Sequence, residues 1–96
     1  MFVTSWGTAG TGNGQFTNTR AIAVGPTGDV FVVDFDNAYQ RTRIQRFDGA
    51  GNFIGKWGRS AFDVDGWFWE PRGIAVDGDN NVFVSDFFRI QKFICP

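Results

Sequence analysis

The sequence predicts an all-β fold built from two four-stranded antiparallel meanders, and three observations support this prediction. A stretch of twenty residues occurs twice: residues 16–35 align with residues 68–87, and ten of the twenty paired positions are identical. Leucine is absent, and the apolar residues are mainly Phe, Val, Ile and Trp, which favour strands over helices. Thirteen glycines supply turns between the apolar runs. One supersecondary unit is therefore used twice.

Each unit contains four segments with strand character. The innermost is short and apolar, the second is rich in β-branched and aromatic residues, and the third alternates apolar with polar residues, which indicates one buried face. The outer segment ends in Trp-Gly. In chain order, the expected strands are Phe2–Trp6, Ala21–Val24, Val30–Asp34, Arg43–Phe47, Phe53–Trp57, Gly73–Val76, Val82–Asp86 and Arg89–Phe93.

Short segments with turn composition join these strands. GPTGD (25–29) and DGDNN (77–81) link the innermost strand of each unit to the second, and DGAGN (48–52) links the third strand to the outer strand. Their glycine, asparagine and aspartate content predicts hairpins. Connections this short require neighbouring strands to be antiparallel.

These residues resemble the NHL repeat family. The matching motifs are Pro71, Gly73–Asp77, Asn81–Asp86, Arg89–Phe93 and the pair Trp57–Gly58. The first unit departs from the pattern, because Thr19-Arg20-Ala21 replaces the Pro-x-Gly start, Gly25 replaces an aspartate, and six extra residues lie within 34–43. The resemblance implies a β-propeller, usually of six blades, in which each meander is one blade. It also implies a protein used mostly to bind proteins, RNA or other ligands, although some related propellers are enzymes.

The order of strands suggests exchange between chains. Within residues 1–96 the order is outer, innermost, second, third, twice over, with repeat units at about 2–47 and 53–93. The strand at 89–93 has no outer strand after it, and the outer strand at 2–6 has no third strand before it. Because propellers have typically 4–8 blades, we expect residues 2–6 to complete a blade of a neighbouring chain. The expected assembly is a homotrimer with six blades, and a dimer or a tetramer also closes a ring.

The sequence lacks residues on which several classes of protein function usually depend. Histidine is absent, which removes the commonest general base and metal ligand and excludes a Ser-His-Asp or Cys-His site. The chain is therefore predicted to be no enzyme and to hold no metal or cofactor; a lyase resembling the NHL-related lyases, which depend on histidine ligands, is a remote alternative. Cys95 is the only cysteine. A net charge of −1 does not favour nucleic acid, and no apolar run is long enough to span a membrane.

One rim of the predicted blades carries the candidate ligand-binding residues. The loops around 36–42 and 62–72 emerge at the same end of the meanders. Trp67 and Trp69 align with Gln15 and Thr17, so the repeat does not require aromatic residues there. An exposed Trp pair indicates a binding surface, and packing against the next chain is the alternative. The candidate rim consists of Tyr39, Arg41, Trp67, Trp69, Arg20 and Arg72.

Two of these arginines start the innermost strands. Arg20 and Arg72 are expected near the mouth of the central channel, where a trimer would place six of them and favour an anion or a water-filled mouth. A structural pairing of these arginines with Asp34 and Asp86, which end the second strands, is favoured over this role. For the two aspartates, a salt bridge to an arginine or a turn hydrogen bond is likewise favoured over metal binding or catalysis. The favoured function is a non-catalytic, self-assembling propeller that serves as a structural or binding scaffold, with further copies of itself as partners. The alternative is a lectin-like or peptide-binding propeller whose aromatic rim binds a small molecule, sugar or peptide.

Overall fold

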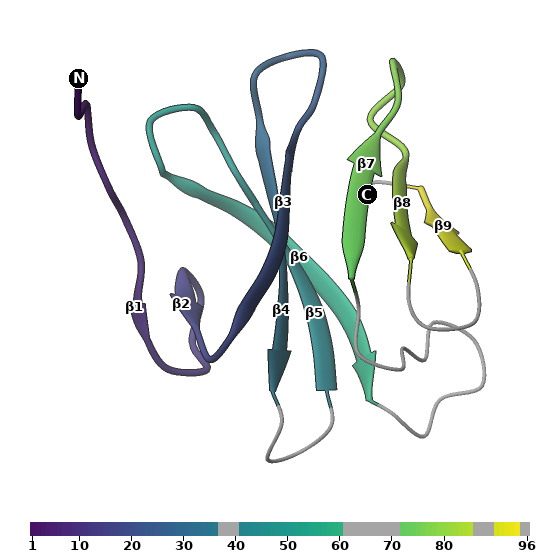
Figure 1. Cartoon of the computed structure of the whole chain (residues 1–96), viewed down its shortest axis with the longest axis horizontal. Helices are drawn as coiled ribbons and strands as arrows, with labels where there is room; N and C mark the ends of the chain where they lie inside the picture. The colour runs from purple at the N-terminus through teal and green to yellow at the C-terminus, as the bar shows by residue number, and fades with distance from the viewer. Residues whose placement is uncertain (37–40, 61–71, 86–89, 95–96) are drawn as a thin grey trace.

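The computed structural model describes residues 1–36, 41–60, 72–85 and 90–94, and all regular structure in these residues is β (Figure 1). Two antiparallel sheets, one of four strands and one of three, make up the body, and a short parallel pair lies near the N-terminus. No helix long and apolar enough to cross a membrane occurs in these ranges. The strands are β1 (Thr8–Ala9), β2 (Gln15–Phe16), β3 (Thr19–Val24), β4 (Val30–Asp36), β5 (Arg41–Phe47), β6 (Phe53–Ser60), β7 (Gly73–Val76), β8 (Val82–Ser85) and β9 (Ile90–Phe93).

Both meanders follow chain order, as the sequence predicts. The four-stranded sheet runs β3-β4-β5-β6 and the three-stranded sheet β7-β8-β9, so the all-β class and the antiparallel neighbours are confirmed. The expected outer strand Phe2–Trp6 makes no strand pair with the described residues of this chain, and its pairing with another chain stays a prediction. The parallel pair β1–β2 was not expected. Asp86 and Arg89, the expected ends of two strands, lie outside the described residues.

The hairpin turns follow from local side-chain chemistry. Asp48 Oδ1 accepts hydrogen bonds from the backbone N–H groups of Ala50 and Asn52, both at 2.9 Å, and closes the β5–β6 turn. Asp77 closes the β7–β8 turn in the same way, with Asn81 in place of Asn52. Hydrogen bonds from these asparagines and from the turn backbone hold the pKa of each carboxyl below its ordinary value of 3.8.

The two faces of each sheet have different compositions, because side chains alternate along a strand. We name them the Val face and the Phe face. In the first unit, the pairing of β3, β4 and β5 places Ile22, Val24, Val30, Val32 and Phe47 on the Val face, and Ala23, Phe31, Val33 and Ile44 on the Phe face. In the second unit, the Val face is Ile74, Val76, Val82, Val84 and Phe93, and the Phe face is Ala75, Phe83, Ser85 and Ile90.

The main core forms where the Phe face of the first unit packs on the Val face of the second. Phe31, Val33, Ile44, Val82 and Val84 are buried there together. Strands β3 and β7 are the contacting inner strands and lie side by side (Figure 1). A smaller core lies on the Val face of the first unit, where residues 6–16, here called the N-terminal segment, cover its outer part. Its members are Val30, Val32 and Phe47, with Phe16 and Phe53 packed against them.

Candidate functional site

The described residues include part of the predicted rim. Tyr39, Trp67 and Trp69 lie outside the described residues. Arg41 starts β5, where its backbone is opposite Asp36 in the ladder with β4. The common rim of these residues therefore stays a prediction.

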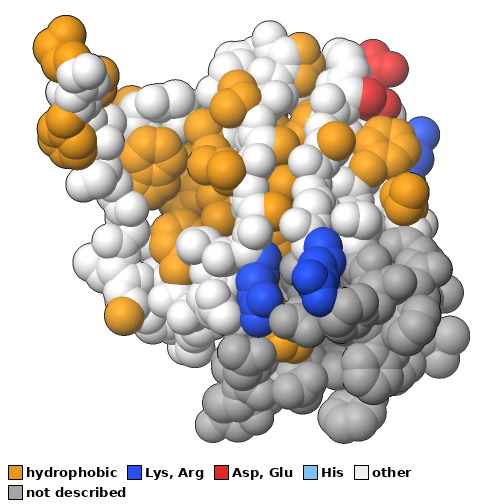
Figure 2. Space-filling model, in the orientation of Figure 1, with side chains coloured by type: hydrophobic (Ala, Val, Ile, Leu, Met, Phe, Trp, Pro, Cys, Tyr) orange, Lys and Arg blue, Asp and Glu red, His pale blue; other side chains and the backbone are white. Residues whose placement is uncertain are grey.

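Arg20 and Arg72 both lie at the start of an inner strand, as predicted. Arg20 occupies an irregular position in β3, and its guanidinium carbon lies 5.6 Å from the centre of the Phe35 ring. Arg72 precedes β7, and its backbone N–H donates to the carbonyl of Ser85 at 2.9 Å. Because β3 and β7 are neighbours, the two arginines begin adjacent strands. Figure 2 shows basic side chains close together on the viewed face.

Asp34 is a structural carboxylate, which confirms the role that the sequence favours for it. Its side chain is buried, with 2% of the residue exposed. It accepts hydrogen bonds from the backbone N–H groups of Thr17 (3.0 and 3.1 Å) and Asn18 (2.8 Å), and it forms an ion pair with Arg43 at 3.5 Å. The carboxylate thus anchors the chain segment that leads into β3. Both of its oxygens already accept hydrogen bonds from groups within the fold.

Arg43 and Gln45 fasten the N-terminal segment onto the Val face. The Arg43 guanidinium donates to the carbonyl oxygens of Thr11 (2.7 Å) and Gly12 (3.0 Å), and also to that of Gln15. Gln45, which is fully buried, donates through Nε2 to the same Gln15 carbonyl at 2.8 Å. Its Oε1 accepts from the Gly14 N–H at 2.8 Å. These bonds hold the backbone of residues 11–15 against the side chains of β5.

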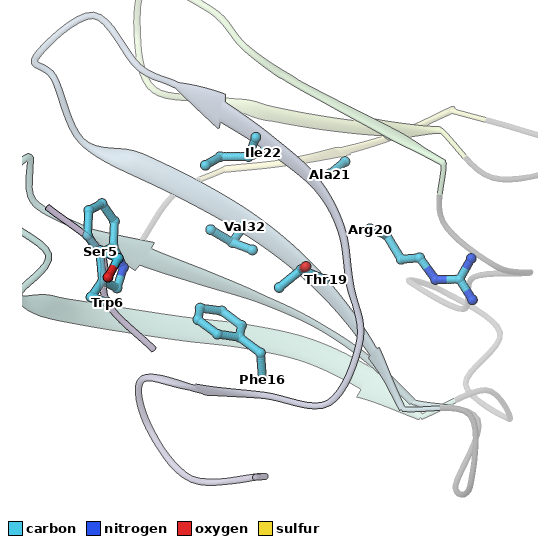
Figure 3. A pocket seen from close by; sticks show the side chains of 8 residues that line it. All are labelled: Ser5, Trp6, Phe16, Thr19, Arg20, Ala21, Ile22 and Val32. Carbon is cyan, nitrogen blue, oxygen red and sulfur yellow. The ribbon is translucent and has the colours of Figure 1, made fainter. Parts of the chain in front are cut away.

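A hollow of about 460 Å³ lies between the N-terminal segment and the inner strand β3 (Figure 3). Trp6, Phe16, Ile22 and Val32 line it, and the guanidinium of Arg20 points away from it. Trp6 comes from the N-terminal segment, and its ring lies 5.9 Å from that of Phe47, centre to centre. Figure 2 shows this hollow as an open apolar area beside the N-terminal segment. The repeat pattern of the sequence does not predict this hollow.

The surface that this region presents is mainly apolar. In the part of the chain that the structure describes, no three His, Cys, Asp or Glu side chains gather as a metal site would need. The buried carboxylate of Asp34 is held by backbone N–H groups and Arg43, and it lies within the fold rather than in an open cleft. What the region offers a partner is apolar surface on β3, with a charged edge at Arg20.

The anchoring residues carry a signal in the sequence. Asp34, Arg43 and Gln45 have identical counterparts in the second unit, namely Asp86, Arg89 and Gln91. A buried glutamine inside a strand needs hydrogen-bond partners, so Gln45, between the apolar residues of its strand, is the residue that could have indicated a bound backbone segment. A comparison with protein-family profiles gives no match, and a comparison with curated protein sequences also gives none. The likeness to NHL repeats therefore stays a prediction.

Proposed function

We propose that this chain is a non-catalytic, self-assembling scaffold of NHL-like blades. Three copies would form a six-bladed ring in which residues 2–6 of one chain extend the second meander of the next. The observation that carries the proposal is the exposed apolar surface on the inner strand: Ile22 is 64% exposed and Val24 is 63% exposed. Full burial of a side chain of this size stabilises an assembly by roughly 1.5–3 kcal/mol.

The edge of the second meander supports the same conclusion. Among the described residues, β9 pairs with β8 and is the last strand of its sheet. An edge strand of this kind is a template for another strand. The first residues of the chain are a suitable partner, because Phe2 and Val3 are exposed and Figure 1 shows the end marked N extending away from both sheets.

The test separates backbone pairing from side-chain packing. Thr4→Pro and Ser5→Pro each remove one backbone N–H, and adjacent N–H groups of a strand point to opposite sides. On an outer strand paired on one side, one proline variant should weaken the oligomer and the other should be tolerated. Thr4→Ala and Ser5→Ala are the matched controls, and deletion of residues 1–7 should abolish the defined oligomer. Equal masses for the deleted and unmodified proteins by native mass spectrometry would contradict strand exchange.

A second candidate function is ligand binding at the rim, and the placement of Arg20 and Arg72 on adjacent inner strands favours it. A ring would repeat this pair around the channel mouth, together with Tyr39, Arg41 and the two tryptophans of the 62–72 loop, and repetition would turn weak single contacts into avidity. The candidate ligands are anionic small molecules, sugars and peptides.

The double substitution Trp67→Ala/Trp69→Ala distinguishes the two roles of the loop. If the rim binds a ligand, the ring keeps its mass and loses binding to a hit from a sugar or peptide array. Loss of the oligomer would instead show that both tryptophans pack between chains, which would remove the main support for a binding rim. Arg20→Gln/Arg72→Gln tests the anionic class in the same assay.

A further inference from the structure

We infer that copies of this chain associate head to tail, with the Val face of the first unit of one copy packed on the Phe face of the second unit of the next. This inference rests on the proposed self-assembly and deepens it, because it assigns the two surfaces that meet. The partner is a second copy of this chain.

The contact between the two units inside one chain provides the template. There, the Val face of the second unit is covered by the Phe face of the first, and Val82 and Val84 are fully buried as a result. The approach is close at the inner strands. A Cβ atom placed on Gly25 would lie 3.4 Å from Cγ1 of Val76 and 2.7 Å from Oδ1 of Asn80. A Val face and a Phe face of these sequences are therefore complementary in shape.

The first unit carries the same Val face without this cover on its inner strand. All five positions are identical in the two units: the pairs are Ile22/Ile74, Val24/Val76, Val30/Val82, Val32/Val84 and Phe47/Phe93. The N-terminal segment covers Phe47 but leaves the hollow beside β3 open. Ile22 and Val24 are consequently exposed, whereas their counterparts Ile74 and Val76 are half-buried.

The second unit carries a Phe face that is open in the same way. Ala75 is exposed, whereas its counterpart Ala23 is half-buried. Ile90 is 73% exposed, whereas its counterpart Ile44 is fully buried. The ring of Phe83 is half-buried, and the ammonium of Lys92 lies 5.4 Å from its centre. The chain thus has one open face of each kind, and each is the counterpart of a face that is already paired internally.

Two different faces at opposite sides of one chain define a heterologous contact. If the contact between chains repeats the rotation between the two units, the assembly continues with equal steps and closes as a ring of blades. Trp6 fits this arrangement, because it already lies against Phe47 at the border of the Val face that the next copy would cover.

A mixing experiment tests the pairing of faces. Ile22→Asp places a charge on the open Val face and Ala75→Asp places one on the open Phe face; Ile54→Asp, at an isoleucine of β6 that is 50% exposed, is the matched control. Each of the first two variants alone should have the 10.7 kDa mass of one chain. Their equimolar mixture should form a 1:1 heterodimer, since each variant retains the face that the other lacks. The control should keep the mass of the unmodified oligomer.

A second set of variants makes smaller changes, so that the inference can be tested even if the aspartate variants fail to fold. In a Cys95→Ser background, Ile22→Cys, Ala75→Cys and Ile54→Cys each introduce one thiol, whose reaction with a disulfide reagent is followed in the oligomer. We expect the thiols at 22 and 75 to react at least ten-fold more slowly than the thiol at 54. Equal rates in an oligomeric protein, or an unchanged mass for Ile22→Asp, would overturn this inference and leave the proposed self-assembly intact. A monomeric unmodified chain would instead remove the proposed function itself.

Discussion

Replacing Asp34 by asparagine should release the segment that leads into β3. The carboxylate accepts the backbone N–H groups of Thr17 and Asn18 and pairs with Arg43, and it is almost fully buried. Asparagine keeps a single acceptor oxygen, so the Thr17 hydroxyl and Arg43, which donate to Oδ2, lose this acceptor, and Arg43 loses its counter-charge. Hydrogen bonds to charged groups contribute about 1.5–3 kcal/mol each. We therefore expect Asp34→Asn to reduce the free energy of unfolding by about 2–4 kcal/mol, which lowers the melting temperature by roughly 10–25 °C in a protein of this size.

The assay is urea denaturation followed by tryptophan fluorescence, at one protein concentration for all variants. Asp29→Asn is the matched control, because Asp29 also pairs with an arginine of β5, Arg46, but its side chain is 15% exposed, whereas that of Asp34 is 3% exposed. Arg46 keeps its contact with the Phe31 ring, 5.3 Å from the guanidinium carbon to the ring centre. The control should cost less than Asp34→Asn, because water can reach Asp29 and no anchored chain segment depends on it. Equal losses for the two variants would refute the assignment of Asp34 as the anchor of this segment.

Three further predictions concern the turns and the open face. Gly51 and Gly28 both have positive φ, at 94° and 88°, so alanine should cost about 1–2 kcal/mol at either position; Gly51→Ala should in addition shift tryptophan emission, because its Cβ would lie 2.8 Å from the Trp6 ring. The lowered pKa of Asp48 means that its contribution to stability is present above the unfolded pKa and is lost as the pH falls through the folded pKa. The urea midpoint should therefore fall between pH 7 and pH 3 by less in Asp48→Asn than in the unmodified protein, and an equal fall would contradict this role. Val24→Glu should weaken the oligomer more than Val24→Lys, because the β7–β8 turn of the next copy presents acidic groups; dilution series that give equal dissociation constants would contradict this placement.

Local chemistry and the repeat made most of the fold predictable. The turns at 25–29, 48–52 and 77–81 depend on side chains and glycines within five residues, so their sequences are sufficient to identify them. The two meanders follow because the alternation of apolar residues is the same in both units. Their mutual packing follows from the need of each unit to cover an apolar face.

The path of the N-terminal segment could not be predicted in the same way. Gly14 is bound by Gln45 and Gln15 by Arg43, and each of these bonds joins residues about thirty positions apart. No local pattern in residues 8–16 predicts contacts between residues so far apart in the sequence. The pair β1–β2 forms because these contacts hold the segment in place. The hollow beside β3 has the same origin, since it is the space between this segment and the sheet. The strand exchange that the sequence predicts for residues 2–6 involves a second chain and stays a prediction.

The mass of the unmodified chain in solution is the most direct test of the proposed self-assembly. Native mass spectrometry and sedimentation velocity at micromolar concentration should give a homotrimer, three times the 10.7 kDa mass of one chain. The trimer should dissociate on dilution as a single cooperative step, because every contact between chains is of the same kind. A folded protein that stays at the mass of one chain at all concentrations would contradict the account.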